Sequence, residues 1–418
     1  MAASSQNISA PTQTTNRHWL VVVLLAIAVL INYVDRSNMS VAAPLLQAEL
    51  GLSPSQLGWL LSAFFWTYAL MQPAVGWLAD RIGAGGIMAA GFVLWSLATS
   101  LTGFVHGFAA LLAARLMLGV GESVFFPASA KILAATIPLN RIGSANSTVM
   151  AGLQAGPAVG ILAGGLLMAR FGWRPFFIVL GLASMLWLLP WLAWMPREQT
   201  GVRDKAAGGP SLGRILCERS FWGTGLGLFA GNYAWYFLLT WLPYYLVRER
   251  GMSAGHMARL GGVAYVCTAG FTFFLGLATD RWIAAGASHT LVRKSVLAVG
   301  YLVSGALLVM CAYAGEHTFA ALLIVATALL GGAGFCAFAT GQTIAGPQAA
   351  GKWVGAQNAF GNLSGVVAPV VTGFVVQRSG HFLSAFVITC MVCVLGACSW
   401  MFVVGRVEPM DWNADFRN

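Results

Sequence analysis

Four charged residues lie inside long apolar stretches of the chain, where no water is available to stabilise a charge. Asp35 and Arg36 are adjacent in LINYVDRSNMS, and Arg115 and Glu122 are seven residues apart in ARLMLGVGES. Seven residues make nearly two helical turns, so Arg115 and Glu122 share a helix face, with Gly119 between them as a point of close helix approach. Carboxylates in such places can carry protons, and guanidinium groups can bind a carboxylate.

These charges have two interpretations. A charge at the bilayer centre costs at least about 2.5 to 3.5 kcal/mol on insertion scales, so the four residues must face one another or water. They could form two buried ion pairs that only join the first and fourth membrane spans. Because desolvation offsets much of the attraction in such pairs, we favour a substrate or proton site. The six histidines all lie in predicted loops or span ends, which leaves Asp35 and Glu122 as the candidate proton carriers.

The composition of the whole chain is that of a membrane protein. Of its 418 residues, 58% are hydrophobic and 9% are charged, whereas soluble domains average about 25% charged residues. A membrane helix needs about 20 apolar residues, so we predict an all-α polytopic membrane protein with twelve transmembrane helices. We attribute the net charge of +10 to Lys and Arg of cytoplasmic loops, and we expect no nucleic-acid partner.

The predicted spans fall into two halves. They lie at 19–36, 57–79, 86–105, 108–136, 143–169, 174–195, 221–247, 257–279, 292–313, 318–346, 353–377 and 382–405. A polar, Gly- and charge-rich stretch divides them six and six. The predicted units are an N-terminal tail at 1–18, a six-helix bundle at 19–196, a cytoplasmic middle loop at 197–220, a second six-helix bundle at 221–406 and a C-terminal tail at 407–418.

The distribution of Lys and Arg predicts the orientation. With both termini inside, most loop Lys and Arg are cytoplasmic, and the outer segments hold mainly Arg170, Arg174, Arg248, Arg250 and Arg378. The first 16 residues are polar and lack the basic-then-apolar order of a signal peptide. We expect a multi-pass protein of the inner (plasma) membrane, embedded in the lipid bilayer as a monomer, with both termini cytoplasmic.

A short sequence repeats at matched positions of the two halves. GWLADRIG follows the second span and GLATDRW follows the eighth. In each, the Gly would allow close helix approach, and the Asp-Arg pair can bind a neighbouring helix end or a partner charge. We interpret them as a conformational latch. Its residues are Gly76, Asp80, Arg81, Gly276, Asp280 and Arg281.

Twelve spans in two halves, a long middle loop and GxxxDRxG between spans two and three resemble the major facilitator superfamily. The stretches around YVDR, WTYALMQP, the Arg-x6-Glu spacing, WYFLLTWLPYYL and GAQNAFGNLSG resemble its anion:cation symporter branch. That branch includes bacterial galactonate, glucarate and hexuronate transporters, aromatic-acid permeases, and sialic-acid and vesicular glutamate carriers. The resemblance implies the major facilitator fold and transport of an organic anion.

Carried over by position, the resemblance implies roles for individual residues. Asp35 and Glu122 would be cation-coupling carboxylates, and Arg36 and Arg115 substrate ligands or switch partners. The further substrate-binding candidates are Tyr33, Tyr68, Gln72, Gln154, Asn232, Tyr236, Thr340 and Asn358. For Gln154, Asn232 and Tyr236, helix packing explains the residue equally well, and the match to relatives is loosest around Thr340.

The resulting hypothesis is a proton-coupled symporter that imports a small organic anion, favoured to be a sugar acid such as an aldonate or hexuronate, by alternating access. Protonation of Asp35 and Glu122 would release Arg36 and Arg115 to bind the substrate carboxylate. The alternatives are the same scaffold carrying aromatic or other carboxylates or coupled to Na⁺, and a membrane receptor or sensor for an anion. The sequence has no HExxH or metal-ligand cluster, and we expect no enzyme activity, metal or cofactor.

Overall fold

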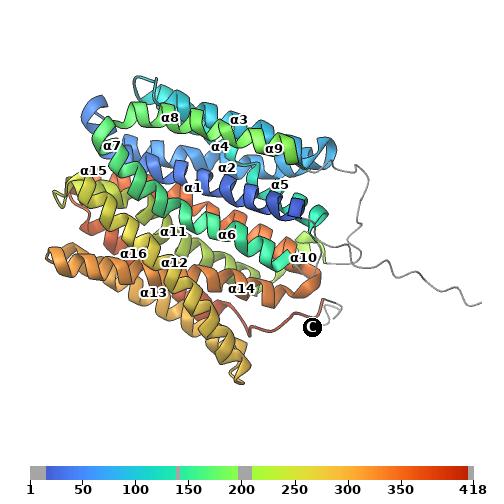
Figure 1. Ribbon diagram of the computed structural model, residues 1–418. Coiled ribbons are helices and arrows are strands. Elements are labelled where there is room, and N and C mark those ends of the chain that lie inside the picture. Colours follow the sequence, from blue (N-terminus) through green and yellow to red (C-terminus); the bar gives the residue numbers. More distant parts are fainter. Residues whose placement is uncertain (1–15, 138–141, 196–209, 413–418) are drawn as a thin grey trace, which may run out of the picture.

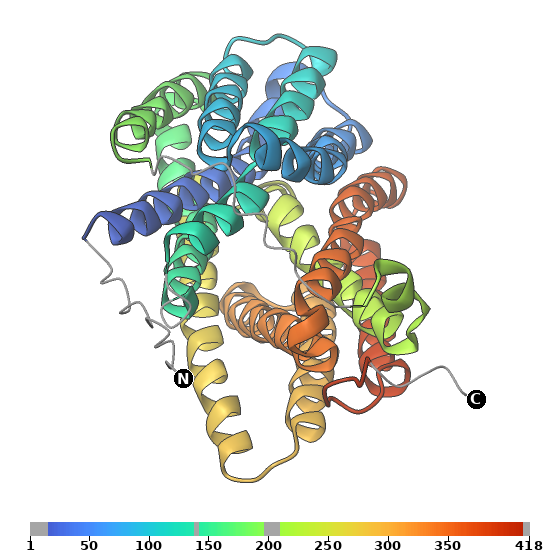
Figure 2. The same cartoon turned by 90° about the vertical axis from the view of Figure 1, so that its right-hand side faces the viewer.

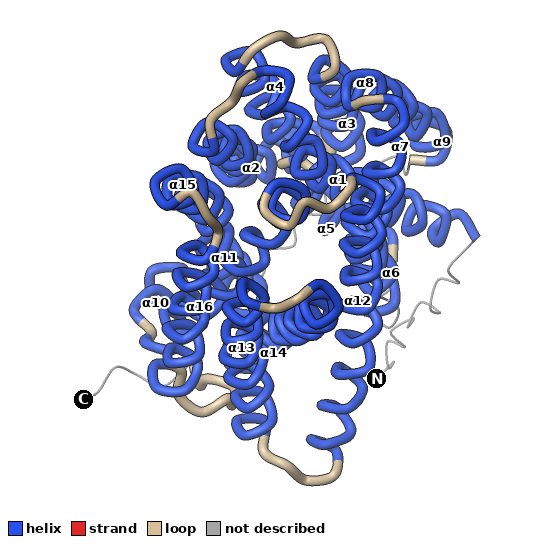
Figure 3. The backbone as a smooth tube through the Cα atoms, turned by 90° about the vertical axis from the view of Figure 1, so that its left-hand side faces the viewer, coloured by secondary structure: helices blue, strands red, loops and turns tan. Residues whose placement is uncertain are grey.

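A computed structural model of the chain describes residues 16–137, 142–195 and 210–412. Within these ranges the chain forms helices and loops and no strand, as the tube in Figure 3 shows. The helices gather in two bundles that lie side by side in Figures 1 and 2, the first built from α1 to α9 and the second from α10 to α16. The prediction of an all-α protein is confirmed.

The elements of the two bundles follow one another in chain order. The first bundle contains α1 (Asn16–Leu50), α2 (Pro54–Ile82), α3 (Ala84–Thr102), α4 (Phe108–Glu122), α5 (Phe125–Thr136), α6 (Ile142–Val159), the π-helical turn η1 (Gly160–Gly164), α7 (Gly165–Phe171), α8 (Trp173–Ser184), the 3-10 turn η2 (Met185–Trp187) and α9 (Leu188–Trp194). The second contains α10 (Leu212–Cys217), α11 (Arg219–Arg248), α12 (Ala254–Ala284), α13 (His289–Tyr313), α14 (Glu316–Asn362), α15 (Ser364–Ser379), α16 (Leu383–Cys398) and the π-helical turn η3 (Ser399–Val403).

Most of the predicted spans are long apolar helices. Among the described residues, ten helical segments are long and apolar enough to cross a membrane. Helices α2 and α11, of 29 and 30 residues, occupy the second and seventh predicted spans. Both contain several Gly, Trp and Tyr residues, which lower their hydropathy. With these two helices, each of the twelve predicted spans corresponds to a helical segment of the described chain.

The start of several helices is encoded locally. Ser53 precedes α2, and its hydroxyl accepts a hydrogen bond from the Gln56 amide while the Gln56 side chain accepts one from the Ser53 amide. This capping box satisfies two amides that have no partner within the helix. Ser253 and Ser288 cap α12 and α13 with their hydroxyls in the same position.

The predicted first span, 19–36, ends too early. Helix α1 continues to Leu50 and has 35 residues, with Pro44 inside it. Hydropathy misses the second part because it is rich in small and polar residues, but neighbouring helices bury them, and Ser37 and Asn38 are fully buried. Asp35 and Arg36 consequently lie near the middle of a long helix instead of at its end.

The structure describes only parts of the predicted tails and middle loop. Residues 1–15, 196–209 and 413–418 lie outside the described part of the chain, so the proposed boundaries there stay predictions. Within the predicted loop, however, residues 212–217 form α10, and α11 begins at Arg219. Residues 407–412 of the predicted tail contact the second bundle, with Val407 and Trp412 buried.

The two bundles meet at one end of the molecule. We call the end where α1 begins and α10 lies the terminal end, and the end where α1 runs into α2 the opposite end, which faces the viewer in Figure 3. At the opposite end α2 and α15 cross so closely that a Cβ on Gly58 would lie 2.6 Å from the Pro369 carbonyl oxygen, and one on Gly373 would lie 2.6 Å from that of Pro54.

Hydrogen bonds between the bundles lie at the same end. The Ser62 hydroxyl donates to the Val366 carbonyl oxygen at 2.9 Å, and the Tyr244 hydroxyl lies 2.9 Å from the Gln47 side-chain oxygen. Helix α12 also contacts η1, where a Cβ on Gly262 would lie 2.8 Å from the Leu162 side chain. The described contacts therefore hold the bundles together at the opposite end.

The latch glycines do not have the close helix contacts that we expected. Among the described residues, a Cβ on Gly76 would meet no atom within 4 Å, and one on Gly276 would make only an ordinary contact, 3.5 Å from the Phe335 ring. The tight helix crossings lie elsewhere, as at Gly58 and Gly373. The Arg81 guanidinium lies 4.2 Å from the Trp77 ring of its own helix, the side chain of Asp80 is outside the described part, and Asp280 and Arg281 are exposed. The latch itself stays a prediction.

Candidate functional site

Arg36 is the centre of the candidate site. Its Nε donates to Glu122 Oε2 at 2.8 Å, and both side chains are buried. Three aromatic rings surround the guanidinium, with Cζ at 4.6 Å from the ring centre of Tyr33, 4.7 Å from Phe64 and 4.4 Å from Tyr68. One carboxylate and three π-faces together stabilise a positive charge far from water.

Asp35 has neighbours of its own on α3 and α4. It is 1% exposed, and among the described residues neither of its carboxylate oxygens has a hydrogen-bond partner. Thr99 of α3 is beside it, and Arg115 and Glu122 lie close enough to act on its charge. Arg115 is 3% exposed, its Cζ lies 5.3 Å from the Phe64 ring centre, and its Nε has no hydrogen-bond partner in the part of the chain that the structure describes.

These four charges form one cluster, as the sequence predicts, but only one ion pair is closed. Residues adjacent in a helix point about 100° apart, so Asp35 and Arg36 contact different neighbours. Arg36 Nη2, Arg115 Nε and both Asp35 oxygens remain without hydrogen bonds within the described structure. Because such groups are costly to bury unpaired, they are the natural places for a proton or an anionic ligand to act.

Helix α4 can reach Arg36 because Gly119 lies against α2. A Cβ at this position would overlap the Phe64 carbonyl oxygen and the Thr67 hydroxyl, and Thr67 donates a hydrogen bond of 2.7 Å to the Leu116 carbonyl oxygen. The predicted close approach at Gly119 is confirmed. On the other side of α1, Gly156 of α6 lies against Tyr33.

Replacing Gly119 with Ala is expected to destabilise the protein. The overlap is with backbone, which cannot rotate away, so we expect a cost of about 1 to 3 kcal/mol and a lower melting temperature of the purified protein in detergent. Gly76→Ala is the matched control on α2, because no atom of the described structure lies within 4 Å of a Cβ at this position. Equal melting temperatures for the two variants would show that α2 and α4 are not held this closely.

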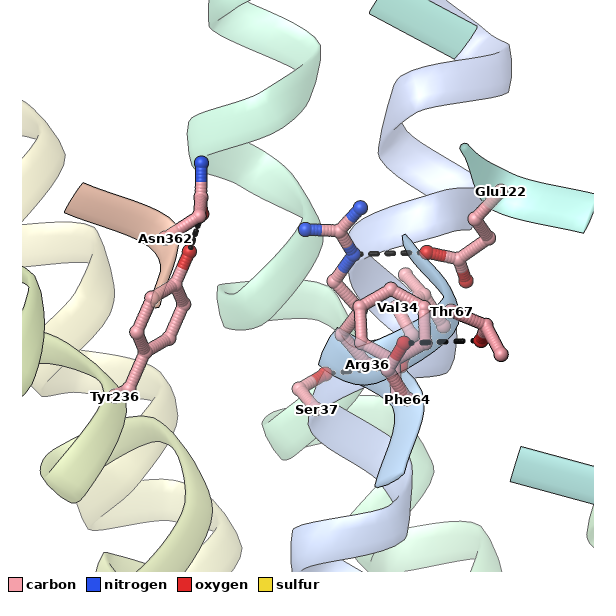
Figure 4. A network of polar contacts seen from close by, with 8 residues as sticks. All are labelled: Val34, Arg36, Ser37, Phe64, Thr67, Glu122, Tyr236 and Asn362. Atoms are coloured by element: carbon pink, nitrogen blue, oxygen red, sulfur yellow. Dashed lines mark hydrogen bonds and ion pairs between the residues drawn. The ribbon is translucent and has the colours of Figure 1, made fainter. Parts of the chain in front are cut away.

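The second bundle contributes Tyr236 and Asn362. The Tyr236 hydroxyl donates to Asn362 Oδ1 at 2.6 Å, and its ring centre lies 4.6 Å from that of Phe65 on α2. Tyr236 is also near enough to Arg36 to act on its charge. Figure 4 shows the Tyr236–Asn362 pair apart from the Arg36–Glu122 pair. The two terminal nitrogens of Arg36 point away from Glu122.

For the other predicted substrate-binding residues, the structure gives burial and local contacts. Gln72 lies one turn beyond Tyr68 on α2, and Gln72, Gln154, Asn232 and Asn358 are all half-buried. Thr340 is fully buried, and its hydroxyl donates to the Cys336 carbonyl oxygen of its own helix at 2.8 Å. The role of these residues in binding stays a prediction.

Sequence reasoning missed Phe64, Asn362 and Thr99. Phe64 is four residues before Tyr68 and Asn362 is four residues after Asn358, so each shares a helix face with a predicted site residue. That spacing could have identified both. Thr99 gives no such signal, because a lone Thr in an apolar helix is common.

Comparison with known proteins identifies the family. The family model of the Major Facilitator Superfamily matches residues 25–292, well over half of the chain. The chain belongs to the major facilitator superfamily. It is accordingly a multi-pass membrane transporter and not an enzyme, and the predicted fold of two six-helix bundles is confirmed.

Individual members of the superfamily align over nearly their whole length. The hexuronate transporter of Bacillus subtilis (strain 168) is 30% identical, with 93% of this chain and 94% of that protein covered. The probable galactarate/D-glucarate transporter GarP of Escherichia coli (strain K12) is 29% identical, with 94% and 96% covered. A solved bacterial homologue of the human lysosomal transporter Spinster, in an inward-facing and occupied conformation, superposes with a TM-score of 0.80 at 18% identity over 93% of this chain and 97% of that chain.

Proposed function

We propose that this transporter is a symporter that imports a sugar acid, such as an aldonate, aldarate or hexuronate, together with protons. The observation that carries the proposal is the buried Arg36–Glu122 pair inside an aromatic cage, next to a second Arg and a second carboxylate. A guanidinium can bind a substrate carboxylate, and a carboxylate that holds it can be neutralised by a proton. The galactarate/D-glucarate and hexuronate transporters among its relatives support the substrate class.

In the proposed cycle, protonation of the site prepares it for the substrate. A proton on Glu122 weakens its hold on Arg36, whose free nitrogens then bind the carboxylate of the substrate. Asp35 is neutralised either by a second proton or by Arg115, which lies nearby. After release of the anion the protons leave, and Arg36 and Glu122 pair again for the return of the empty carrier.

We further propose that the terminal end faces the cytoplasm of a cell whose inner membrane holds the protein. The bundles are joined at the opposite end by the α2–α15 crossing and by the Ser62–Val366 hydrogen bond. In this orientation the structure corresponds to a state closed to the outside. Alternating access would require these contacts to separate while others form at the terminal end.

Uptake into proteoliposomes tests the proposal. Purified protein should accumulate labelled glucarate or glucuronate when an inward proton gradient is imposed, and a sodium gradient alone should not drive accumulation. Aromatic acids serve as the competing substrate class. Accumulation driven only by sodium, or of aromatic acids alone, would replace the proposal with the corresponding alternative. Binding without any transport would indicate a receptor.

We expect Tyr236 and Asn362 of the second bundle to bind the hydroxyl groups of the substrate. Tyr236→Phe removes the donor to Asn362 Oδ1, and we expect the KM for sugar acids to rise about fivefold, the effect of one lost hydrogen bond. Tyr301→Phe is the matched control, because its hydroxyl donates to the Gly227 carbonyl oxygen inside the same bundle. An equal KM change in both variants would remove Tyr236 from the site.

A further inference from the structure

Helix α14 is interrupted at Gly346. This residue has φ 64° and ψ 174°, a conformation that only glycine adopts easily, and Pro347 follows it. Carbonyl groups in the turn before such a break lose the amides four residues ahead that would otherwise bind them. Ile344 and Ala345 lie in that turn.

The last described residues of the chain bind these two carbonyls. The Met410 amide donates to the Ile344 oxygen at 2.9 Å, and the indole Nε1 of Trp412 donates to the Ala345 oxygen at 2.7 Å. Trp412 is 6% exposed, although it lies close to the chain end. The tail therefore acts as the C-terminal cap of a helix to which it is not adjacent in sequence.

The Trp412 ring also touches both sides of the break and the linker helix. Its ring centre lies 6.3 Å from that of Trp353, which is in the second arm of α14, and the Arg214 guanidinium of α10 lies 5.8 Å from it. Lys352 donates to the Pro210 carbonyl oxygen at 2.9 Å, which joins the second arm to the segment before α10. One side chain thus connects the two arms of α14 and the connection between the bundles.

We propose that residues 407–412 form a clasp that fixes the angle between the two arms of α14, the parts before and after Gly346. Trp412 would thereby act as a positioning residue for the substrate-binding candidates on this helix. Thr340 lies on the first arm, and Asn358 and Asn362 lie on the second. Asn358 is twelve residues beyond Gly346, about 18 Å along a helix, so a rotation of about 10° at the break moves it by about 3 Å. Displacements of that size are enough to disrupt binding.

Hydrogen–deuterium exchange of the full-length protein tests the clasp without any transport assay. Trp412→Phe keeps an aromatic ring beside Trp353 but removes the indole donor. We expect the amides of residues 343–352 to exchange about fivefold faster, the shift produced by one lost hydrogen bond, and faster still in Trp412→Ala. Trp282→Phe is the control, because Trp282 is 47% exposed at the end of α12.

Transport kinetics test the positioning role, which rests on the proposed function. We expect Trp412→Phe to raise the KM for the sugar acid several-fold, whereas simple loss of folded protein would lower only the maximal rate. Faster exchange with an unchanged KM would support the clasp but contradict the positioning role of Trp412. Unchanged exchange in both Trp412 variants would overturn the clasp itself. Failure of the wild-type protein to transport sugar acids would overturn the proposed function and leave the exchange result standing.

Discussion

Glu122→Gln is expected to abolish proton-driven accumulation while leaving exchange of labelled for unlabelled substrate. Gln has nearly the shape of Glu and can still accept a hydrogen bond from Arg36 Nε, which lies 2.8 Å from the carboxylate oxygen, but it cannot take up or release a proton. A gradient of two pH units can support up to about 100-fold accumulation for each coupled proton, since each unit is worth about 1.36 kcal/mol. In the variant this ratio should fall to about 1, the value for a carrier without coupling.

Glu49→Gln is the matched control for this experiment. Glu49 also accepts a hydrogen bond of 2.8 Å from an arginine Nε, that of Arg174, but it is 46% exposed near the end of α1. If the loss of any Arg–Glu ion pair in the first bundle were enough to abolish coupling, both variants would fail to accumulate substrate. Full accumulation by Glu122→Gln would assign the proton to another residue, and Asp35→Asn would then be the next variant to measure.

Arg36→Lys is expected to weaken sugar-acid binding by at least about tenfold, which is the lower end of the cost of losing one hydrogen bond made by a charged group. Lysine keeps the charge. It has no planar group to lie against the rings of Tyr33, Phe64 and Tyr68 while binding two acceptors at once. The measurement is the dissociation constant for glucarate, by calorimetry or by the ligand-induced rise in melting temperature.

Arg174→Lys controls for the general effect of this substitution. Arg174 also combines an ion pair with an aromatic neighbour, since its Cζ lies 4.3 Å from the Trp173 ring, but it lies at the opposite end, away from the site. We expect its affinity for glucarate to be that of the wild type. Unchanged affinity in Arg36→Lys as well would mean that Arg36 only holds α1 and α4 together.

The sequence predicts which charges gather but not which of them pair. The cost of burying a charge in lipid is large enough to bring Asp35, Arg36, Arg115 and Glu122 together in any fold that buries them. The choice of Glu122 as the partner of Arg36 depends on how α1 is rotated, which the contact at Gly156 and the crossing at Gly119 decide. Both depend on the tertiary structure.

Aromatic residues show a second limit of sequence reasoning. Phe64 forms one wall of the Arg36 cage, yet in an apolar span it cannot be distinguished from a residue that only packs. The contacts of Trp412 are beyond sequence reasoning for another reason. Its hydrogen bond to Ala345 joins a polar tail to a helix break 67 residues earlier, and no local pattern connects the two. What hydropathy predicts well is the spans, because burial in lipid acts on each helix separately.

The length of α1 has a mechanical consequence. Its 35 residues extend about 52 Å, and Arg36 is its twenty-first residue, close to the midpoint. If the first bundle tilts by about 10° around this midpoint, each end of α1 sweeps about 4 to 5 Å, whereas the atoms at the centre scarcely move. If Arg36 binds the substrate, as we propose, α1 pivots at the binding site, and both of its ends can move while the guanidinium stays in contact with the substrate.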